Sequence, residues 1–77
     1  MKKIENDTFE IQFGEFIKQA REEKCLNQSE IAEKIGIGQP HLSLFEKGER
    51  VVSFKRALKI CKALDIDIKE FIENYTE

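Results

Sequence analysis

Hydrophobic residues recur every three or four positions along most of this 77-residue chain, which is the spacing of one face of an α-helix. The pattern predicts a first helix from about 8 to 24, then helices at about 28–35, 39–47 and 54–64, and a fifth that begins near 68. The second and third helices carry an apolar seam of Ile31, Ile35, Leu42 and Phe45. We therefore expect an all-α domain in which these two helices pack closely together.

Polar residues mark most of the helix boundaries. Three pairs have the spacing of a capping box, namely Asp7 with Glu10, Asn27 with Glu30, and Asp67 with Glu70. Ser53 can cap the fourth helix. Gly36 and Gly48 stand where the second and third helices must end, and Pro40 falls in the first turn of the third. These signals predict where the helices begin and end.

Two assignments depend on which residues face the core. Phe9, Ile11 and Phe13 alternate in a way that also suits a short strand, so the start of the first helix stays open between the two structures. The fourth helix has an expected inner face of Phe54, Ala57, Leu58, Cys61 and Leu64. We expect a single domain, residues 1–77, with a flexible arm at about 1–7 and a helical core at 8–75.

The run Lys34-Ile35-Gly36-Ile37-Gly38-Gln39, followed by Leu42, Phe45 and Gly48, resembles the helix-turn-helix of the lambda-repressor-like family. This family includes phage repressors, Cro proteins and the XRE-family regulators, and the resemblance extends from about Phe13 to Phe71. It implies a compact five-helix fold in which helices 2 and 3 form the helix-turn-helix. It also implies a sequence-specific regulator of transcription, a repressor in the first instance, that reads the major groove of a palindromic operator as a homodimer.

The resemblance implies roles for the exposed residues of the third helix. Base contacts are expected from Gln39, Pro40, Ser43 and Leu44. A glutamine can bind N6 and N7 of adenine, although Gln39 could instead only favour the helix start. Leu44 could contact a thymine methyl group or a protein partner. Gln28 matches a family glutamine that binds a phosphate and braces the recognition helix through Gln39.

The charge distribution supports a nucleic-acid partner despite a net charge of −2. Residues 47–62 hold six basic side chains against one acidic, a local charge of +5, whereas the segments on either side are acidic. Some of these side chains could be ordinary solvated helix surface. The expected phosphate contacts are Gln28, His41, Lys47, Arg50, Lys55 and Arg56.

A dimer interface is expected at the C-terminus, from Ile68, Phe71, Ile72 and Tyr75. Ile68 and Phe71 can also face the domain's own core. Ile72 and Tyr75 continue the apolar stripe where little chain remains to cover them, which favours an interface. The alternative is that these two side chains pack back on Phe9 or Phe16.

Catalysis, metals and cofactors are not expected. The chain has one histidine and two widely separated cysteines, so neither a nucleophile–base pair nor a metal-binding set is apparent. Cys61 is expected in the core, and Cys25 stands where the family often has glycine. No apolar run has the length of a membrane span, and the first residues lack the apolar region of an export signal, so we expect a cytoplasmic protein of bacterial or phage origin.

Other functions remain open. The chain could be a helix-turn-helix adaptor that binds protein instead of DNA, or the toxin-neutralising partner of a toxin–antitoxin pair. The weak capacity of Pro40 and Leu44 to read bases favours such a role, and the basic segment 47–62 disfavours it.

Overall fold

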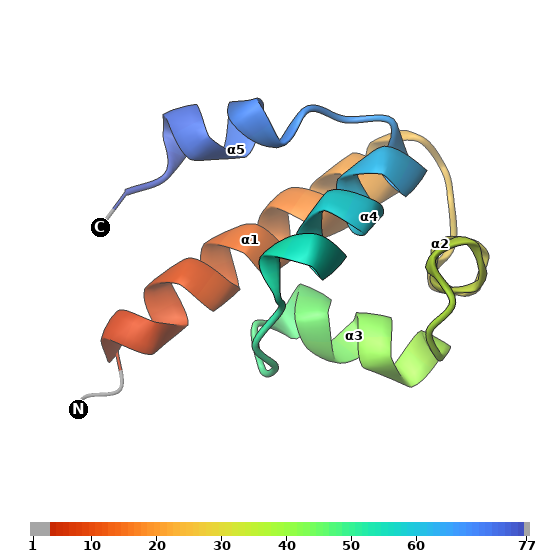
Figure 1. The fold of residues 1–77 in the computed structure, drawn as a ribbon, viewed down its shortest axis with the longest axis horizontal. Coiled ribbons are helices and arrows are strands. Elements are labelled where there is room, and N and C mark those ends of the chain that lie inside the picture. Colours follow the sequence, from red (N-terminus) through yellow and green to blue (C-terminus); the bar gives the residue numbers. More distant parts are fainter. Residues whose placement is uncertain (1–3, 77) are drawn as a thin grey trace.

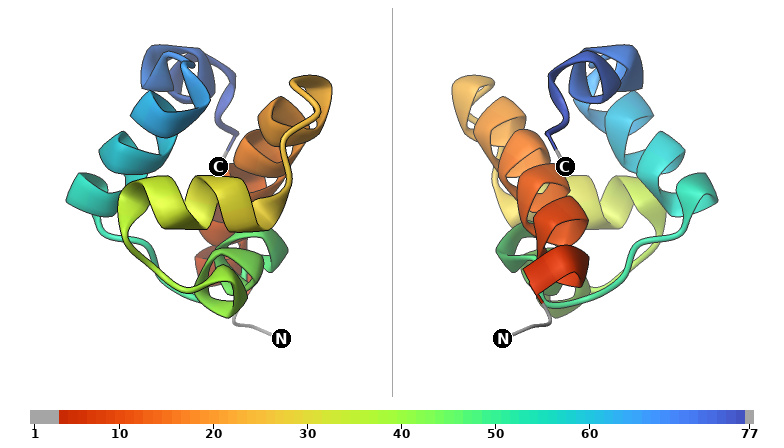
Figure 2. Two further views of the ribbon diagram at one scale, coloured as in Figure 1. Left: turned by 90° about the vertical axis from the view of Figure 1, so that its right-hand side faces the viewer. Right: turned by 90° about the vertical axis from the view of Figure 1, so that its left-hand side faces the viewer.

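The structure is a computed structural model that describes residues 4–76, with side chains from Phe9 to Thr76. Five helices follow one another: α1 (Ile4–Glu23), α2 (Gln28–Ile35), α3 (Gln39–Lys47), α4 (Phe54–Leu64) and α5 (Ile68–Asn74). α3 and α5 lie on opposite sides of the molecule, with α1 and α4 between them (Figures 1 and 2). The described residues contain no strand, so a strand at Phe9–Phe13 is wrong and the all-α prediction is confirmed.

The caps of the middle helices are formed as predicted. Asn27 Oδ1 accepts from the Glu30 N–H at 2.8 Å, and Glu30 Oε1 accepts from the Asn27 N–H at 2.9 Å. Ser53 Oγ accepts from the Arg56 N–H at 3.1 Å at the start of α4. Gly36 and Gly48 end α2 and α3 with φ of 76° and 73°, in the left-handed region that glycine adopts without strain.

The caps of the two outer helices differ from prediction. α1 begins at Ile4, so Asp7 lies inside the helix and is not its cap. Residues 4–7 of the predicted arm are therefore helical, and residues 1–3 lie outside the described residues. Asp67 caps α5 by accepting from the Lys69 N–H at 3.0 Å. The capping box is wrong here, because the Glu70 side chain does not return a bond to Asp67.

The core forms between α1, α2, α3 and α4, and Phe71 of α5 packs into it. Its largest fully buried side chains are Phe13, Ile17, Ile31, Leu42, Ile60 and Leu64. The predicted seam is present, since Ile31, Leu42 and Phe45 are buried and Ile35 packs against them. Cys61 is also buried, and burial raises the pKa of its thiol from 9.0 to about 11. No described helix is long and apolar enough to cross a membrane.

The inner face of α4 is rotated from the predicted one. Phe54 is 68% exposed and Leu58 38% exposed, whereas Ile60, which was not expected in the core, is fully buried. The buried set is Ala57, Ile60, Cys61 and Leu64, which also follows helical spacing. Apolar residues lie on two adjacent faces of α4, so the sequence allowed either face to be buried. Packing against α1 and α2 buries the face that carries Ile60.

α1 crosses α3 at a glycine. A Cβ atom at Gly14 would lie 2.5 Å from the Phe45 carbonyl oxygen and 2.6 Å from that of Glu46. These are backbone atoms and cannot move aside cheaply. Gly14 therefore sets the close approach that fixes α3 against the longest helix of the molecule.

Candidate nucleic-acid interface

One side of α3 is built into the core and the other is open to solvent. Leu42, Phe45 and Glu46 are its buried residues. Four residues with predicted base contacts lie on the remaining surface: Gln39 and Pro40 are exposed, and Ser43 and Leu44 are partly exposed. Because α3 lies at one edge of the molecule, this surface is accessible to a large ligand (Figure 2).

A chain of polar contacts joins the start of α3 to the core. The Gln39 amide donates to the side-chain oxygen of Gln28, as expected from the sequence. The Gln28 amide donates to Glu46 Oε1 at 2.8 Å. Glu46 in turn accepts from Arg21 twice, Oε2 from Nε at 2.7 Å and Oε1 from Nη2 at 3.0 Å. The position of Gln39 is thereby tied to a buried ion pair.

Arg21 and Glu46 were not predicted as part of the site. They are only 9% and 6% exposed, and Arg21 Nη1 also donates to the Leu26 carbonyl oxygen at 2.8 Å. The hydrogen bond to Glu46 raises the pKa of the Arg21 guanidinium, so the cation is held in its charged form. One signal was available in the sequence, since Glu46 stands four residues after Leu42 and so lies on the same helical face.

The Gln28 side chain has capacity left for a further ligand. A carboxamide carries two N–H donors, and only one of them is engaged by Glu46. The second can donate to a phosphate oxygen, which is the predicted role of Gln28. Ser43 and Lys47 line the same hollow between α1 and α3 as Gln28, so the three polar groups form one surface. Lys18 of α1, which was not among the predicted contacts, lines it as well.

The other predicted phosphate contacts form a second group. His41 stacks on Phe45 with ring centroids 6.2 Å apart, and Arg50 Nη1 lies 3.2 Å from His41 Nε2. Lys55 and Arg56 stand in the first turn of α4, where Lys55 is exposed and Arg56 partly exposed. The structure thus brings His41 and Arg50 together and places Lys55 and Arg56 on the next helix.

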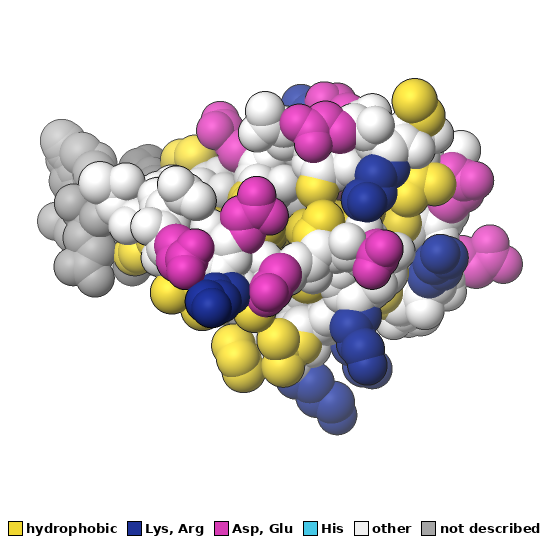
Figure 3. All heavy atoms as spheres, turned by 90° about the horizontal axis from the view of Figure 1, so that it is seen from above, with side chains coloured by type: hydrophobic (Ala, Val, Ile, Leu, Met, Phe, Trp, Pro, Cys, Tyr) yellow, Lys and Arg dark blue, Asp and Glu magenta, His cyan; other side chains and the backbone are white. Residues whose placement is uncertain are grey.

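Part of the acidic charge lies on the side of the molecule away from α3. The face that carries α5 shows many Asp and Glu side chains (Figure 3), and Asp65, Asp67, Glu70 and Glu73 are all exposed. Since α5 lies on the side opposite α3 (Figure 1), these four carboxylates do not oppose a polyanion at α3. Glu15, Glu46 and Glu49, in contrast, line the hollow beside α3.

The predicted dimer interface needs correction. Phe71 is buried, and the Tyr75 ring packs on Phe9 and Phe71 with centroid distances of 5.9 and 5.6 Å. Ile68 is partly buried against the same core. The alternative of packing on Phe9 therefore holds for Tyr75, because α1 extends far enough to cover it. Of the four residues, Ile72 alone is largely exposed, at 59%.

Comparisons with known proteins agree with this geometry. A helix-turn-helix family model matches residues 17–71. An uncharacterized HTH-type transcriptional regulator of Bacillus subtilis (strain 168), YqaE, is 34% identical over 56 residues, which is 73% of this chain and 48% of that protein. This chain thus spans about half the length of that relative. The crystal structure of the restriction-modification controller protein C.AhdI from Aeromonas hydrophila matches with a TM-score of 0.74 and 33% identity, over 79% of this chain and 92% of that one.

Proposed function

Because this chain belongs to the helix-turn-helix family, we propose that it is a sequence-specific regulator of transcription that reads double-stranded DNA in the major groove with α3. The similarity to a transcriptional regulator and to a restriction-modification controller supports this role. We propose a repressor that acts in the cytoplasm of a bacterial or phage-infected cell, and a binding protein without catalytic activity.

The observation that carries the proposal is the fixed position of Gln39. One of its two amide N–H donors is engaged by Gln28, which leaves one donor and the carbonyl acceptor. An adenine in the major groove offers the complementary pair, an acceptor at N7 and a donor at N6. A side chain that is already held in place loses less conformational entropy on binding, so it discriminates better between bases.

Backbone contacts would come from the surrounding polar groups. Gln28 and Lys47 flank the exposed side of α3, and Lys55 and Arg56 stand at the start of α4. Such contacts position the protein on the duplex without reading sequence. They also release counterions, so the logarithm of the affinity should fall with the logarithm of the salt concentration by about 0.9 per phosphate contacted.

A salt titration tests this arrangement. Replacing both Lys55 and Arg56 by alanine should flatten the slope by up to about 2 and weaken binding to all sequences similarly. A matched control replaces Lys24 and Lys69, which are exposed on other parts of the surface, and should leave the slope unchanged. An unchanged slope in the Lys55/Arg56 variant would remove the start of α4 from the interface.

A second copy of the chain would complete the site. One recognition helix covers half of an operator, and a symmetric dimer places two helices in successive major grooves about 34 Å apart. Apolar residues of the last two helices offer a surface for this, which we call the α4–α5 apolar surface: the exposed Phe54, Leu58 and Ile72 and the partly buried Ile68. Phe54 and Leu58 share one face of α4, Ile68 and Ile72 share one face of α5, and Leu58 and Ile68 line the same hollow. We propose this surface as the dimer interface, in place of Phe71 and Tyr75.

A further inference from the structure

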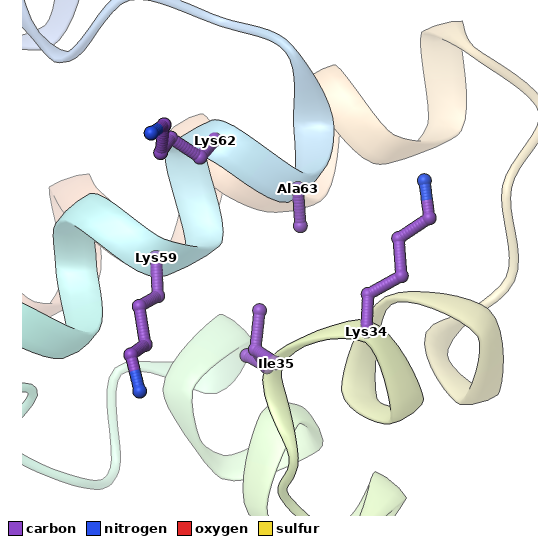
Figure 4. A pocket seen from close by; sticks show the side chains of 5 residues that line it. All are labelled: Lys34, Ile35, Lys59, Lys62 and Ala63. Atoms are coloured by element: carbon purple, nitrogen blue, oxygen red, sulfur yellow. The ribbon is translucent and has the colours of Figure 1, made fainter.

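Two lysines of the basic segment 47–62 are not accounted for by the proposed DNA contacts. Lys59 and Lys62 lie on the second half of α4, beyond the turn that carries Lys55 and Arg56. Together with Lys34 of α2 they line an open hollow of about 460 Å³. Figure 4 shows that Ile35 and Ala63 point toward one another across this hollow, with Lys34 on one side and Lys59 and Lys62 on the other.

The hollow is positively charged and lacks internal compensation. Its lining contains three ammonium groups and no carboxylate. Within residues 9–76 the ion pair between Arg21 and Glu46 is the only one, so none of the three lysines is paired with a carboxylate of that region. Like charges that share one concave surface raise the local potential and attract an anion, although the protein as a whole has a net charge of −2.

The floor of the hollow is apolar. Ile35 and Ala63 are both only partly buried, so they offer hydrocarbon surface between the cations. A simple anion would contact the lysine ammonium groups and leave this floor in water. A peptide that places an aliphatic side chain between carboxylates would contact both, since burying apolar area is favourable in its own right.

We propose that the hollow between α2 and α4 is a docking site for an acidic segment of a partner protein, with an apolar side chain against Ile35 and Ala63 and flanking carboxylates on Lys34, Lys59 and Lys62. Charge complementarity identifies the occupant as acidic, and the apolar floor favours peptide over phosphate.

The docking site and the proposed DNA surface use different parts of α2. Gln28, at its start, lines the hollow between α1 and α3, whereas Lys34, near its end, lines the hollow against α4. Lys34 stands six positions after Gln28, which places the two side chains about 120° apart around the helix. A partner at the docking site would therefore leave Gln28 and Gln39 free to contact DNA.

The probe for the test is a fluorescein-labelled peptide in which leucine is flanked on both sides by Asp and Glu, measured by anisotropy against the full chain at low salt. A second peptide has serine in place of leucine, and a third has the acidic residues replaced by lysine. The leucine peptide should bind more tightly than the serine peptide, and the lysine peptide should not bind. Equal binding of the leucine and serine peptides would overturn the proposal, because the apolar floor would then have no role.

Two variants with equal charge change locate the site. The Lys34→Gln, Lys59→Gln, Lys62→Gln variant should lose about tenfold or more in peptide affinity, as expected when charge-assisted contacts are removed. The control variant Lys18→Gln, Lys24→Gln, Lys69→Gln changes exposed lysines that do not line this hollow and should lose far less. Equal losses of peptide affinity in the two variants would show that the peptide responds only to the overall charge of the protein, and would overturn the proposed site.

Chemical-shift mapping on the unaltered protein locates the peptide without the need for any variant. The leucine peptide should perturb the amides of Lys34, Ile35, Lys59, Lys62 and Ala63 and leave those of Gln28 and Gln39 unchanged. Perturbations centred on α3 would contradict the proposal. Displacement of the peptide by a random DNA duplex, together with a flatter salt slope of DNA binding in the Lys34/Lys59/Lys62 variant, would also contradict it. The hollow would then belong to the DNA interface.

Discussion

Arg21 of α1 and Glu46 of α3 form a buried two-pronged ion pair, with Nε–Oε2 and Nη2–Oε1 distances of 2.7 and 3.0 Å. This pair fixes α3 to the longest helix of the domain, and through Gln28 it also sets the position of Gln39. Stability and the geometry of the proposed DNA-binding surface therefore depend on the same two residues.

Removing one member of the pair should be far more harmful than removing both. Arg21→Met or Glu46→Leu leaves a buried charge without a partner, and each should lower the free energy of unfolding by about 3–5 kcal/mol. The double variant leaves no buried charge at this position and should recover much of the loss. Urea denaturation of the four proteins measures this. Single variants that lose less than about 1 kcal/mol would show that water, and not Glu46, satisfies Arg21.

Gln39→Ala should reduce affinity for the preferred operator by about 1–3 kcal/mol and relax specificity at one base pair. Leu44→Ala should lose less, and only where the contacted base is thymine. Binding of each variant to a panel of operators with single base changes measures both effects. If Gln39→Ala weakens all sequences equally, Gln39 serves only the start of the helix. If Leu44→Ala spares DNA binding and abolishes a protein complex, the adaptor function is favoured.

Replacing Cys25 by glycine, the residue that the family often has at this position, should stabilise the folded protein. Its φ is 58°, a left-handed conformation that costs a side chain with a Cβ atom about 1–2 kcal/mol. Cys25→Gly should therefore raise the free energy of unfolding, by about 0.5–1 kcal/mol after the greater flexibility of glycine in the unfolded chain is subtracted. Cys25→Ala keeps the strained backbone and is the matched control for loss of the thiol. Equal stability of the glycine and alanine variants would contradict the assignment of strain.

The α4–α5 apolar surface should control the oligomeric state. Phe54→Asp combined with Ile72→Asp places charge on two exposed positions and should convert a dimer to a monomer in sedimentation, with helicity retained. The control Lys24→Gln with Lys69→Gln makes the same change in net charge elsewhere and should remain dimeric. A dimer that survives the aspartates would place the interface on another surface.

The bounds and caps of the middle helices could be predicted from the sequence because local residues determine them. The α2 and α3 boundaries lie at Asn27, Gly36 and Gly48 because each of these residues satisfies a backbone requirement of its own turn. The Gln28–Gln39 contact was also predictable, since the helix-turn-helix resemblance pairs these two positions.

Features that depend on packing between distant segments could not be predicted. Gly14 appears as an ordinary helical residue until α3 crosses it, and Arg21 appears as a surface cation until Glu46 meets it. The phase of α4 depends on its packing against α1 and α2, and the burial of Tyr75 depends on its packing against Phe9 and Phe71. The errors at these two points displaced the predicted dimer surface while leaving the predicted α3 surface in place.

The most direct test of the central claim is the affinity of the full chain for a duplex selected from a random pool, compared with a scrambled duplex of the same length and composition at the same salt concentration. A sequence-specific regulator should bind the selected duplex at least about a thousandfold more tightly, and the selected sites should be palindromic if two copies bind together. Equal affinity for the two duplexes, or no binding to either at low salt, would contradict the claim that α3 reads DNA sequence.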